Sequence, residues 1–289
     1  MRYAKMLGRV VGYMPHSPDI AAEEHKITEA NAGKKISQRA YNRHFRREQA
    51  LLSLSDFVVF PSYNASTAYR SRFSTVFEAN KKVYYLESGV DVPEIDPNLA
   101  IPEVLMRAKD RTVVLFAGRY NSHKGYDLFC QAAEVFGEES DFCFFSAGGG
   151  PIATPDGGVV TDLGWQPNIH SILPHVDIVV IPNRIAYYDL WPLECAAFAK
   201  GLVMTAVGGS RDQLLDLPDT VSVGRASPRS IELGIREAKS ELDKNKSWGA
   251  LNKEAYLKKY TSRLFARRWS NTIEKIYSDY DSRLSKLQR

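Results

Sequence analysis

Residues 112–125 read TVVLFAGRYNSHKG, and this stretch decides the class of fold. Its first part, from Thr112 to Ala117, is an apolar run with the length and β-branched content of a buried strand. The loop that follows, residues 118–125, is here called the two-cation loop, because it places two cations between two glycines: Gly118, Arg119, Lys124 and Gly125. A helical pattern begins soon after, at Asp127. A strand, a polar loop and a helix in this order open a βαβ unit, which predicts an α/β fold with a parallel sheet.

The same alternation continues along the second half of the chain. We expect strands over residues 112–117, 142–147, 159–162, 178–181 and 202–206, and helices over residues 127–136, 169–173 and 193–199. The last segment, from Ser262 to Tyr280, has apolar residues at helical spacing and predicts a long packing helix. Strands that alternate with helices form a parallel sheet with helices on both faces.

The first half contains weaker signals of the same kind. Three apolar runs have the length of strands, at residues 10–14, 57–60 and 83–86, and residues 26–52 have a helical composition that Gly33 interrupts. Prolines among acidic residues then indicate an interdomain connection: Pro93, Pro97 and Pro102. We predict a shortened N-terminal Rossmann-like domain over residues 1–104, a second Rossmann-like domain over residues 105–262, and a packing helix over residues 263–289.

Composition restricts the class of protein. The chain has 289 residues, of which 44% are hydrophobic and 25% charged, as in a globular protein of one or two domains. The formal net charge of +4 permits an acidic ligand without requiring a nucleic acid. Cys130, Cys143 and Cys195 lie in apolar surroundings without CxxC spacing, which predicts buried thiols in a reducing compartment. The sequence shows no membrane-spanning run and no secretory signal, so we expect a cytoplasmic protein, with peripheral membrane contact left open.

The loops after the strands are the candidate sites, because ligands bind outside the carboxyl ends of strands in an open parallel sheet. The fork of donors on Arg119, the charge of Lys124 and the free N–H groups of a helix start suit a diphosphate, and a solvated cationic loop is an equal alternative. Glycines at 148–150 permit close approach of a ligand or simply form a flexible turn.

Two later loops add a carboxylate and further glycines. Glu194 lies near a helix start among apolar residues, where a ligand contact competes with ordinary stabilisation by the helix dipole. Residues 207–210 offer backbone amides to a phosphate. Neither GxxxxGK[ST] nor GxGxxG occurs, so the sequence supports neither a P-loop ATPase nor a dinucleotide enzyme.

Taken in order, these loops resemble the C-terminal domain of glycosyltransferase family four, which has the retaining GT-B type of fold. The matching positions lie within residues 112–214 and include the two-cation loop, residues 148–151, Gly164 with Trp165, Asp177, residues 190–197, and Gly208 with Gly209. The resemblance implies two Rossmann-like domains and a nucleoside diphosphate sugar as donor. It implies that Arg119 and Lys124 hold the diphosphate and act in catalysis, that Glu194 binds the ribose, and that the base lies near Gly164 and Trp165. The other positions predicted to bind the donor are Gly118, Gly149, Asp189, Leu190, Gly208 and Gly209.

The sequence departs from the family pattern in two respects. The family has two glutamates eight positions apart, but the position eight residues before Glu194 is Ala186. The first of those glutamates contacts the donor sugar or the outgoing phosphate, so the sugar and the turnover stay open; Asp189 could substitute, although it aligns with a glycine of the motif. The N-terminal part matches only about half of the family's acceptor domain. Its His16 resembles the histidine that lines the cleft, which implies a catalytic role, and a purely structural histidine is an equal alternative.

From the resemblance we expect metal-independent transfer of a sugar, with retention and without a cofactor, from a nucleoside diphosphate sugar to a hydroxyl of a glycan, lipid or protein. The alternative is a non-catalytic nucleotide-sugar-binding subunit that pairs with a second chain, which Ala186 and the short N-terminal part favour. A nucleotide-sugar epimerase would need acid and base residues that the sequence does not locate. The Arg-rich residues 34–47 could contact anionic lipid, but a solvated helix face explains them better, and no nucleic-acid-binding pattern occurs.

Overall fold

The computed structural model of the chain describes residues 1–31, 33–79, 81–92, 94–95, 101–108, 110–137 and 141–284. The chain divides into two compact units, here called the first unit (residues 1–88 with 262–289) and the second unit (residues 89–261). The C-terminal helix therefore belongs with the N-terminal residues. The division at Ser88 precedes the predicted connection, of which Pro93 and Pro97 lie outside the described residues. As functional domains, 1–104, 105–262 and 263–289 stay predictions.

The second unit is built on a parallel sheet of six strands in the order β6-β5-β4-β7-β8-β9. The strands are β4 (Thr112–Arg119), β5 (Phe142–Gly149), β6 (Val160–Asp162), β7 (Ile178–Ile181), β8 (Gly201–Thr205) and β9 (Thr220–Val223). Counted along the chain from β4, this is the doubly wound Rossmann order, whose topological switch point lies between β4 and β7. The structure confirms the predicted α/β class and five predicted strands, and β9 is an addition to them.

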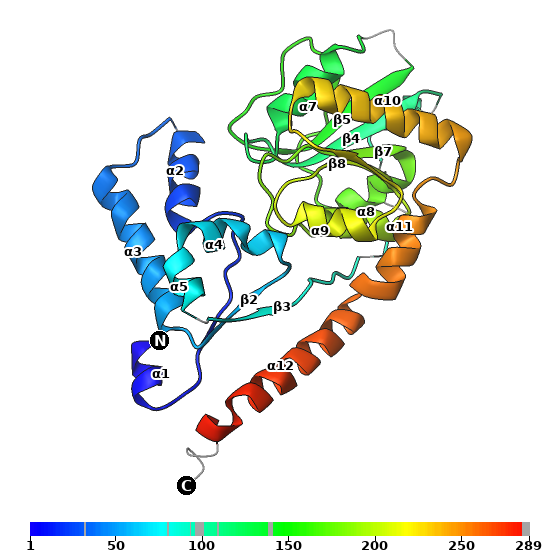
Figure 1. Ribbon diagram of the computed structural model, residues 1–289. Helices are drawn as coiled ribbons and strands as arrows, with labels where there is room; N and C mark the ends of the chain where they lie inside the picture. Colours follow the sequence, from blue (N-terminus) through cyan, green and yellow to red (C-terminus); the bar gives the residue numbers. More distant parts are fainter. Residues whose placement is uncertain are drawn as a thin grey trace. The chain divides into compact units, whose positions relative to one another are not determined.

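Helices cover both faces of this six-stranded sheet (Figure 1). One face carries α7 (Tyr126–Glu134) and α10 (Pro228–Lys244), and the other carries α8 (Trp191–Ala197), α9 (Ser210–Asp216) and α11 (Ala250–Ala255). Along β4, Val114 and Phe116 join the core beneath α7 and α10, whereas Val113 and Leu115 join the core beneath α8. This alternation is the period of two that a strand shows when both of its faces are buried.

Shorter elements complete the second unit. They are α6 (Glu103–Arg107), the 3₁₀ helix η2 (Ile169–His175) and the π-helical turn η3 (Tyr256–Tyr260). The helix predicted at 169–173 is a 3₁₀ helix, which includes Pro174; proline lacks the N–H that an α-helical hydrogen bond needs. Cys130 and Cys195 are buried as predicted, whereas Cys143 is half-buried at the edge of the core. Burial raises the pKa of the Cys130 thiol to about 11.

The first unit is built on a parallel sheet of three strands in the order β1-β2-β3. Its elements are α1 (Arg2–Met6), β1 (Gly12–Tyr13), α2 (Ala21–Asn31), α3 (Gln38–Leu54), β2 (Phe57–Phe60), the 3₁₀ turn η1 (Asn64–Ser66), α4 (Thr67–Arg72), α5 (Ser74–Glu78), β3 (Lys82–Tyr85) and α12 (Ser262–Leu284). Phe265 and Ile276 of α12 pack against Val59, Tyr84 and Leu86. The apolar face predicted for the last segment is therefore a packing surface for this sheet.

The long helical region predicted at 26–52 is two helices, α2 and α3, on either side of a break. Gly33 lies in that break with a φ of 72°, a conformation that favours glycine. The arginines of α3 are exposed: Arg39, Arg43, Arg46 and Arg47. Within the described part of the chain, no helix is both long enough and apolar enough to cross a membrane.

Candidate functional site

Two adjoining cavities open at the carboxyl ends of β4, β5 and β7 in the second unit. The larger cavity, of about 470 Å³, is lined by Ala117, Gly118, Arg119, Ala147, Gly148, Gly149, Trp165, Gln166, Ile169 and Trp191. The smaller cavity, of about 170 Å³, includes Lys124, Asn183, Asp189 and Leu190 in its lining. Ala117, Gly118 and Trp191 line both cavities. The pair lies at the switch point of the sheet, which is where open α/β sheets bind ligands.

Glycines allow the loops around these cavities to approach one another closely. Gly148 has a φ of 147°, and a Cβ atom there would lie 1.9 Å from the carbonyl oxygen of Gly118. Gly125 has a φ of 69°, and its Cβ atom would lie 2.0 Å from the carbonyl oxygen of Pro182. Real atoms do not approach so closely, so both positions require glycine. The loop after β4 therefore packs against the ends of β5 and β7 through backbone contacts that are too close to admit a side chain at Gly148 or Gly125.

The two predicted cations reach the cavities by different routes. Arg119 is the exposed last residue of β4, lines the larger cavity, and has no ion-pair partner among the described residues. Lys124 lines the smaller cavity, where its Nζ lies 2.5 Å from Oδ2 of Asp189. Asn183 donates to the same oxygen of Asp189 from 2.7 Å. Asp189 therefore fixes the ammonium group of Lys124 and lowers the net charge of the smaller cavity.

Glu194 lies in the first turn of α8 and faces His170 of η2. Nε2 of His170 lies 3.1 Å from Oε2 of Glu194, and Oε1 of Glu194 has no partner among the described residues. The His170 ring also packs against Phe198, with ring centroids 5.7 Å apart. Trp191, one helical turn before Glu194, and Ile169, the residue before His170, line the larger cavity, whereas Glu194 itself is in the lining of neither cavity. One oxygen is thus used for positioning, and the other can accept a hydrogen bond from a ligand.

Trp191 and Trp165 give the larger cavity two aromatic walls. Nε1 of Trp191 is buried and has no hydrogen-bond partner among the described residues. Buried N–H groups are usually paired, so a free one beside a cavity is a donor that a ligand can satisfy. Trp165 is 79% exposed and follows Gly164, whose φ of 64° turns the chain after β6. The sequence analysis predicted Trp165 but missed Trp191, although it adjoins the predicted Leu190.

Asp162 connects three of the loops around the larger cavity. Its Oδ1 accepts hydrogen bonds from the hydroxyl of Tyr120 (2.6 Å) and the backbone N–H of Gly164 (2.8 Å), and its Oδ2 accepts one from Thr154 (3.0 Å). Burial alone would raise the pKa of Asp162, but these hydrogen bonds outweigh it and hold the pKa below its usual value. The ionised carboxylate therefore fixes the turn that presents Trp165.

Arg184 was also missed by the sequence analysis, and it braces the two-cation loop. Its guanidinium donates to both carboxylate oxygens of Asp127 at 2.6 Å and to the carbonyl oxygen of Ser122 at 2.7 Å. Burial would raise the pKa of Asp127, but the guanidinium of Arg184 outweighs it and holds the pKa below its usual value. The position of Arg184 directly after the strand at 178–181 could have marked it as a candidate site residue. Its partner Asp127 lies 57 residues away in the sequence, so the ion pair could not be predicted from the sequence.

Replacement of Arg184 by Met should loosen the two-cation loop. We expect the free energy of unfolding at pH 7 to fall by roughly 1 kcal/mol, because the ion pair is partly exposed. The rate of the sugar transfer expected from the sequence should fall about ten-fold, because Lys124 would be misplaced. The pKa of Asp127 is lowered by folding, so the stability difference should start to shrink as the pH falls below about 4, and it should vanish only below the lowered pKa of the folded state. Denaturant titrations of the unmodified chain, of Arg184→Met and of a control variant, at pH 7 and pH 3, measure these differences in stability. Arg107→Met, which breaks the exposed ion pair with Glu103, is the matched control, and equal effects of both substitutions would contradict the brace.

The remaining predicted residues lie in different places. Gly118 and Gly149 line the larger cavity, and Leu190 lines the smaller cavity. The N–H of Gly209 donates to the carbonyl oxygen of Ala186 at 3.2 Å, and a Cβ atom on Gly208 would lie 1.9 Å from the same oxygen. Gly208 and Gly209 therefore pack against the loop of Ala186 and line neither cavity; a role in donor binding stays a prediction. His16 is exposed after β1 in the first unit, and its catalytic role also stays a prediction.

Part of the sequence and the fold of the chain are similar to those of known proteins. Residues 111–237 match the family model described as Glycosyl transferases group 1. A search of curated proteins gave no match. The sucrose-phosphate synthase of Thermosynechococcus elongatus is similar in structure, with a TM-score of 0.69 and 15% identity over 93% of this chain and 68% of that chain.

Two further solved structures are similar over nearly the whole chain. Anabaena HepE, in complex with UDP and glucose, has a TM-score of 0.67 and 14% identity over 94% of this chain and 73% of that chain. A glycosyltransferase from Rickettsia africae has a TM-score of 0.60 and 14% identity over 95% of this chain and 92% of that chain. Identities this low show the fold alone, whereas the family match rests on sequence. Residues 111–237 are thus similar in sequence to group 1 glycosyl transferases, and the chain has the mixed α/β, parallel-sheet fold of GT-B glycosyltransferases.

Proposed function

We propose that the chain transfers a sugar from a nucleoside diphosphate sugar to a hydroxyl acceptor, with retention and without a metal ion or other cofactor. The observation that carries this proposal is the pair of adjoining cavities, with Arg119 on one and Lys124 on the other. Gly118 lines both cavities, so a diphosphate that lies over its backbone meets a cation on each side. The nucleoside occupies the larger cavity and the sugar the smaller one.

The lining of the larger cavity supports a nucleoside. Trp165, Trp191 and Ile169 provide apolar and aromatic surface for a base, and aromatic rings stack on planar bases. Oε1 of Glu194 accepts a hydrogen bond from a ribose hydroxyl, while His170 holds the other oxygen. Structures of the similar protein HepE are in complex with UDP and with UDP-glucose, which supports a uridine diphosphate sugar as the first donor to test.

Charge stabilisation is the chemical step that the site can perform. Negative charge develops on the diphosphate as the bond from the sugar C1 breaks. Arg119 and Lys124 can stabilise this charge, and Lys124 is held in place by Asp189 before the reaction. Preorganised charge of this kind lowers the barrier without reorganisation. Asp189 and Asn183 line the smaller cavity. There the Asp189 carboxylate accepts hydrogen bonds from hydroxyls of the sugar, and the Asn183 amide donates hydrogen bonds to them.

The two cations, Arg119 and Lys124, supply the electrostatic effect that a metal ion supplies in other transferases. We therefore expect 5 mM EDTA to leave the rate of sugar transfer unchanged within about two-fold, since a resident metal that neutralises a leaving group contributes several kcal/mol to catalysis. The measurement is the initial rate with and without chelator, followed by addition of Mg²⁺ or Mn²⁺. A loss of activity that either ion restores would contradict metal independence.

Calorimetric titration with UDP-, GDP- and ADP-sugars, followed by assays of donor hydrolysis and of transfer, tests the proposed function. Binding with turnover supports the enzyme, and the anomeric configuration of the product, read by NMR coupling constants, tests retention. Binding without turnover would favour the alternative, a non-catalytic nucleotide-sugar-binding subunit. That alternative has one specific observation in its favour, because the buried Ala186 stands where the family has a glutamate. Failure to bind any of these sugars would contradict both.

We further propose a reducing cytoplasmic environment for the chain. The three cysteines form no disulfide, and burial raises the pKa of the Cys195 thiol well above its usual value. Thiols of this kind are unreactive and persist reduced. The hydroxyl acceptor of the proposed sugar transfer is a glycan, a lipid or a protein.

A further inference from the structure

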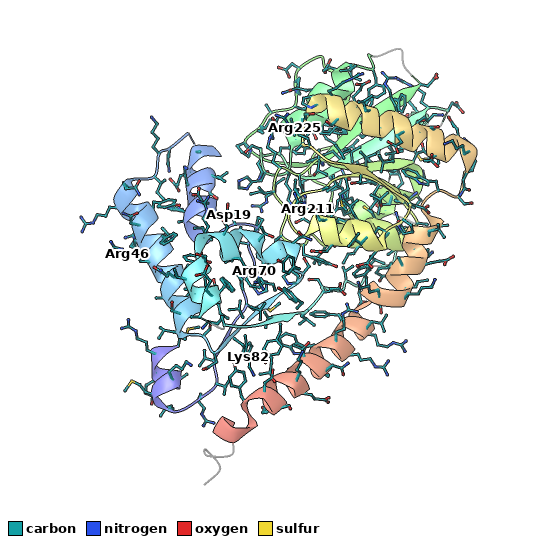
Figure 2. The ribbon with its side chains drawn as sticks, viewed as in Figure 1. Asp19, Arg46, Arg70, Lys82, Arg211 and Arg225 are labelled. Carbon is teal, nitrogen blue, oxygen red and sulfur yellow. The ribbon has the colours of Figure 1, made fainter. Side chains whose placement is uncertain are left out.

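Arg70 of the first unit lies in a cluster with two exposed tyrosines at the carboxyl edge of the three-stranded sheet. Tyr63 follows the end of β2, and Tyr85 is the last residue of β3. Their ring centroids are 6.2 Å apart, and the two strands are direct neighbours, with Phe60 paired to Tyr85. Figure 2 labels Arg70 on the short helix α4, which follows β2 in the chain.

The guanidinium of Arg70 is held in place on several sides. Nε donates to the hydroxyl of Ser66 at 2.9 Å, and Nη2 donates to the hydroxyl of Tyr85 at 2.7 Å. Its Cζ lies 5.4 Å from the ring centroid of Tyr63 and 5.5 Å from that of Phe77. Aromatic faces attract a cation but do not neutralise it. The arginine is therefore immobilised, although one of its terminal nitrogens, Nη1, makes no hydrogen bond to a described residue.

No carboxylate is paired with Arg70 in the described ranges of the chain. Arg72, two residues later in α4, has Glu23 as an ion-pair partner. A half-buried guanidinium without a counter-ion, fixed by neutral groups, is an arrangement that suits an external anion, because arginine binds carboxylate and phosphate through a fork of donors. The cluster therefore has the charge and the geometry of an anion site.

The tyrosines give this anion site a surface for a sugar ring. Tyr63 is 61% exposed and Tyr85 is 41% exposed, so both rings are accessible to a ligand. Exposed aromatic rings and their hydroxyls suit an amphipathic ligand with one apolar face, such as a pyranose. A charged group on the same sugar would reach Nη1 of Arg70.

The cluster shares its helix with a contact to the loop of His16. The hydroxyl of Tyr69, the residue before Arg70 in α4, donates to the carbonyl oxygens of Ser17 and Asp19 at 3.2 and 3.1 Å. β1, which leads into this loop, is the neighbour of β2 in the sheet. His16 and the Arg70 cluster therefore both follow carboxyl ends of adjacent parallel strands, which is the edge where such sheets bind ligands.

We propose that Arg70, Tyr63 and Tyr85 form an acceptor subsite for a saccharide that carries a negatively charged group. The assignment of this subsite to an acceptor rests on the proposed transferase function. Binding of the saccharide itself does not depend on turnover of the donor. The charged group is a carboxylate, as in a uronic acid, or a phosphate ester on the sugar. A neutral sugar occupies the aromatic surface without the contact to Arg70.

Ligand-observed NMR titration of the full chain with three probes tests the proposal: methyl β-D-glucuronide, glucose 6-phosphate and methyl β-D-glucoside. We expect one of the charged probes to bind at least ten-fold more tightly than the glucoside. Arg70→Met should weaken that probe by roughly ten- to hundred-fold, the worth of a hydrogen bond to a charged group. Arg46→Met is the matched control, because Arg46 is exposed on α3 and has no ion-pair or aromatic partner among the described residues. It should leave binding unchanged.

Tyr63→Ala is the second variant, because loss of an exposed side chain leaves the fold intact; it should weaken all three probes. UDP titration of the same samples separates the two proposals, since Arg70→Met should leave the affinity for UDP unchanged. A preference for the glucuronide assigns a carboxylated acceptor, and a preference for the phosphate assigns a phosphorylated one. Equal binding of charged and neutral probes, or unchanged binding by both Arg70→Met and Tyr63→Ala, would overturn the subsite while UDP binding left the donor site standing.

Discussion

Replacement of Arg119 or of Lys124 by Ala should lower kcat for sugar transfer by about 10²- to 10³-fold, the usual effect of removing one preorganised group that stabilises transition-state charge. The two cations line adjoining cavities, and Gly118 lies between them. Each is expected to act on a different side of the diphosphate. KM for the donor should rise by less than kcat falls, because the charge to be stabilised is largest in the transition state. Steady-state kinetics with the donor identified by calorimetry measures both constants.

Arg107→Ala is the matched control for this pair of substitutions. Arg107 is exposed on α6, before the start of β4, and its ion pair with Glu103 makes no contact with either cavity. Its kcat should equal that of the unmodified chain within about two-fold, as surface substitutions usually do. Turnover unchanged in Arg119→Ala and Lys124→Ala would remove both residues from the mechanism.

Gly148→Ala should strongly destabilise the second unit. The φ of 147° is strained for alanine, and the new Cβ atom would lie 1.9 Å from the carbonyl oxygen of Gly118. Neither backbone can move freely, because Gly148 pairs with Gly118 in the sheet. We expect roughly 2–4 kcal/mol of destabilisation and a fall in Tm of roughly 5–15 °C. Donor affinity should fall with it, since the displaced strand ends form the floor of the larger cavity.

Gly149→Ala provides the comparison at the next position. A Cβ atom on Gly149 would meet nothing within 4 Å, and its φ lies outside the left-handed range. Its Tm should therefore stay within about 2 °C of the unmodified chain, since an unhindered surface substitution costs under about 0.5 kcal/mol. Thermal unfolding of the two variants side by side measures the difference. Similar Tm values for both would show that the close contact at Gly148 is not a constraint on the fold.

The sequence predicted the architecture of the second unit because its signals are local. Apolar runs such as 112–117 and 178–181 have the length of buried strands, and the glycines and cations after β4 follow one strand directly. β9 escaped prediction because Thr220–Val223 alternates polar and apolar residues over only four positions. The packing of the last helix on the first unit could not be predicted from the sequence, since packing partners such as Phe265 and Val59 lie far apart in it.

Much of the site depends on pairs that no local pattern contains. Lys124 meets Asp189, His170 meets Glu194, and Arg184 meets Asp127 only when the carboxyl ends of β4, β5 and β7 are brought to one edge. The sequence supplied Lys124, Asp189 and Glu194 as candidates through the family resemblance. It could not supply His170 or Arg184, because their roles consist in holding another side chain.

The most direct test of the central claim is a crystal structure of the chain with the nucleoside diphosphate that binds most tightly in the titration series. The account predicts the diphosphate over Gly118, within hydrogen-bond distance of both Arg119 and Lys124, with the ribose against Glu194 and the base between the walls of the larger cavity. A nucleotide bound elsewhere, or one whose phosphates point away from both cations, would contradict it.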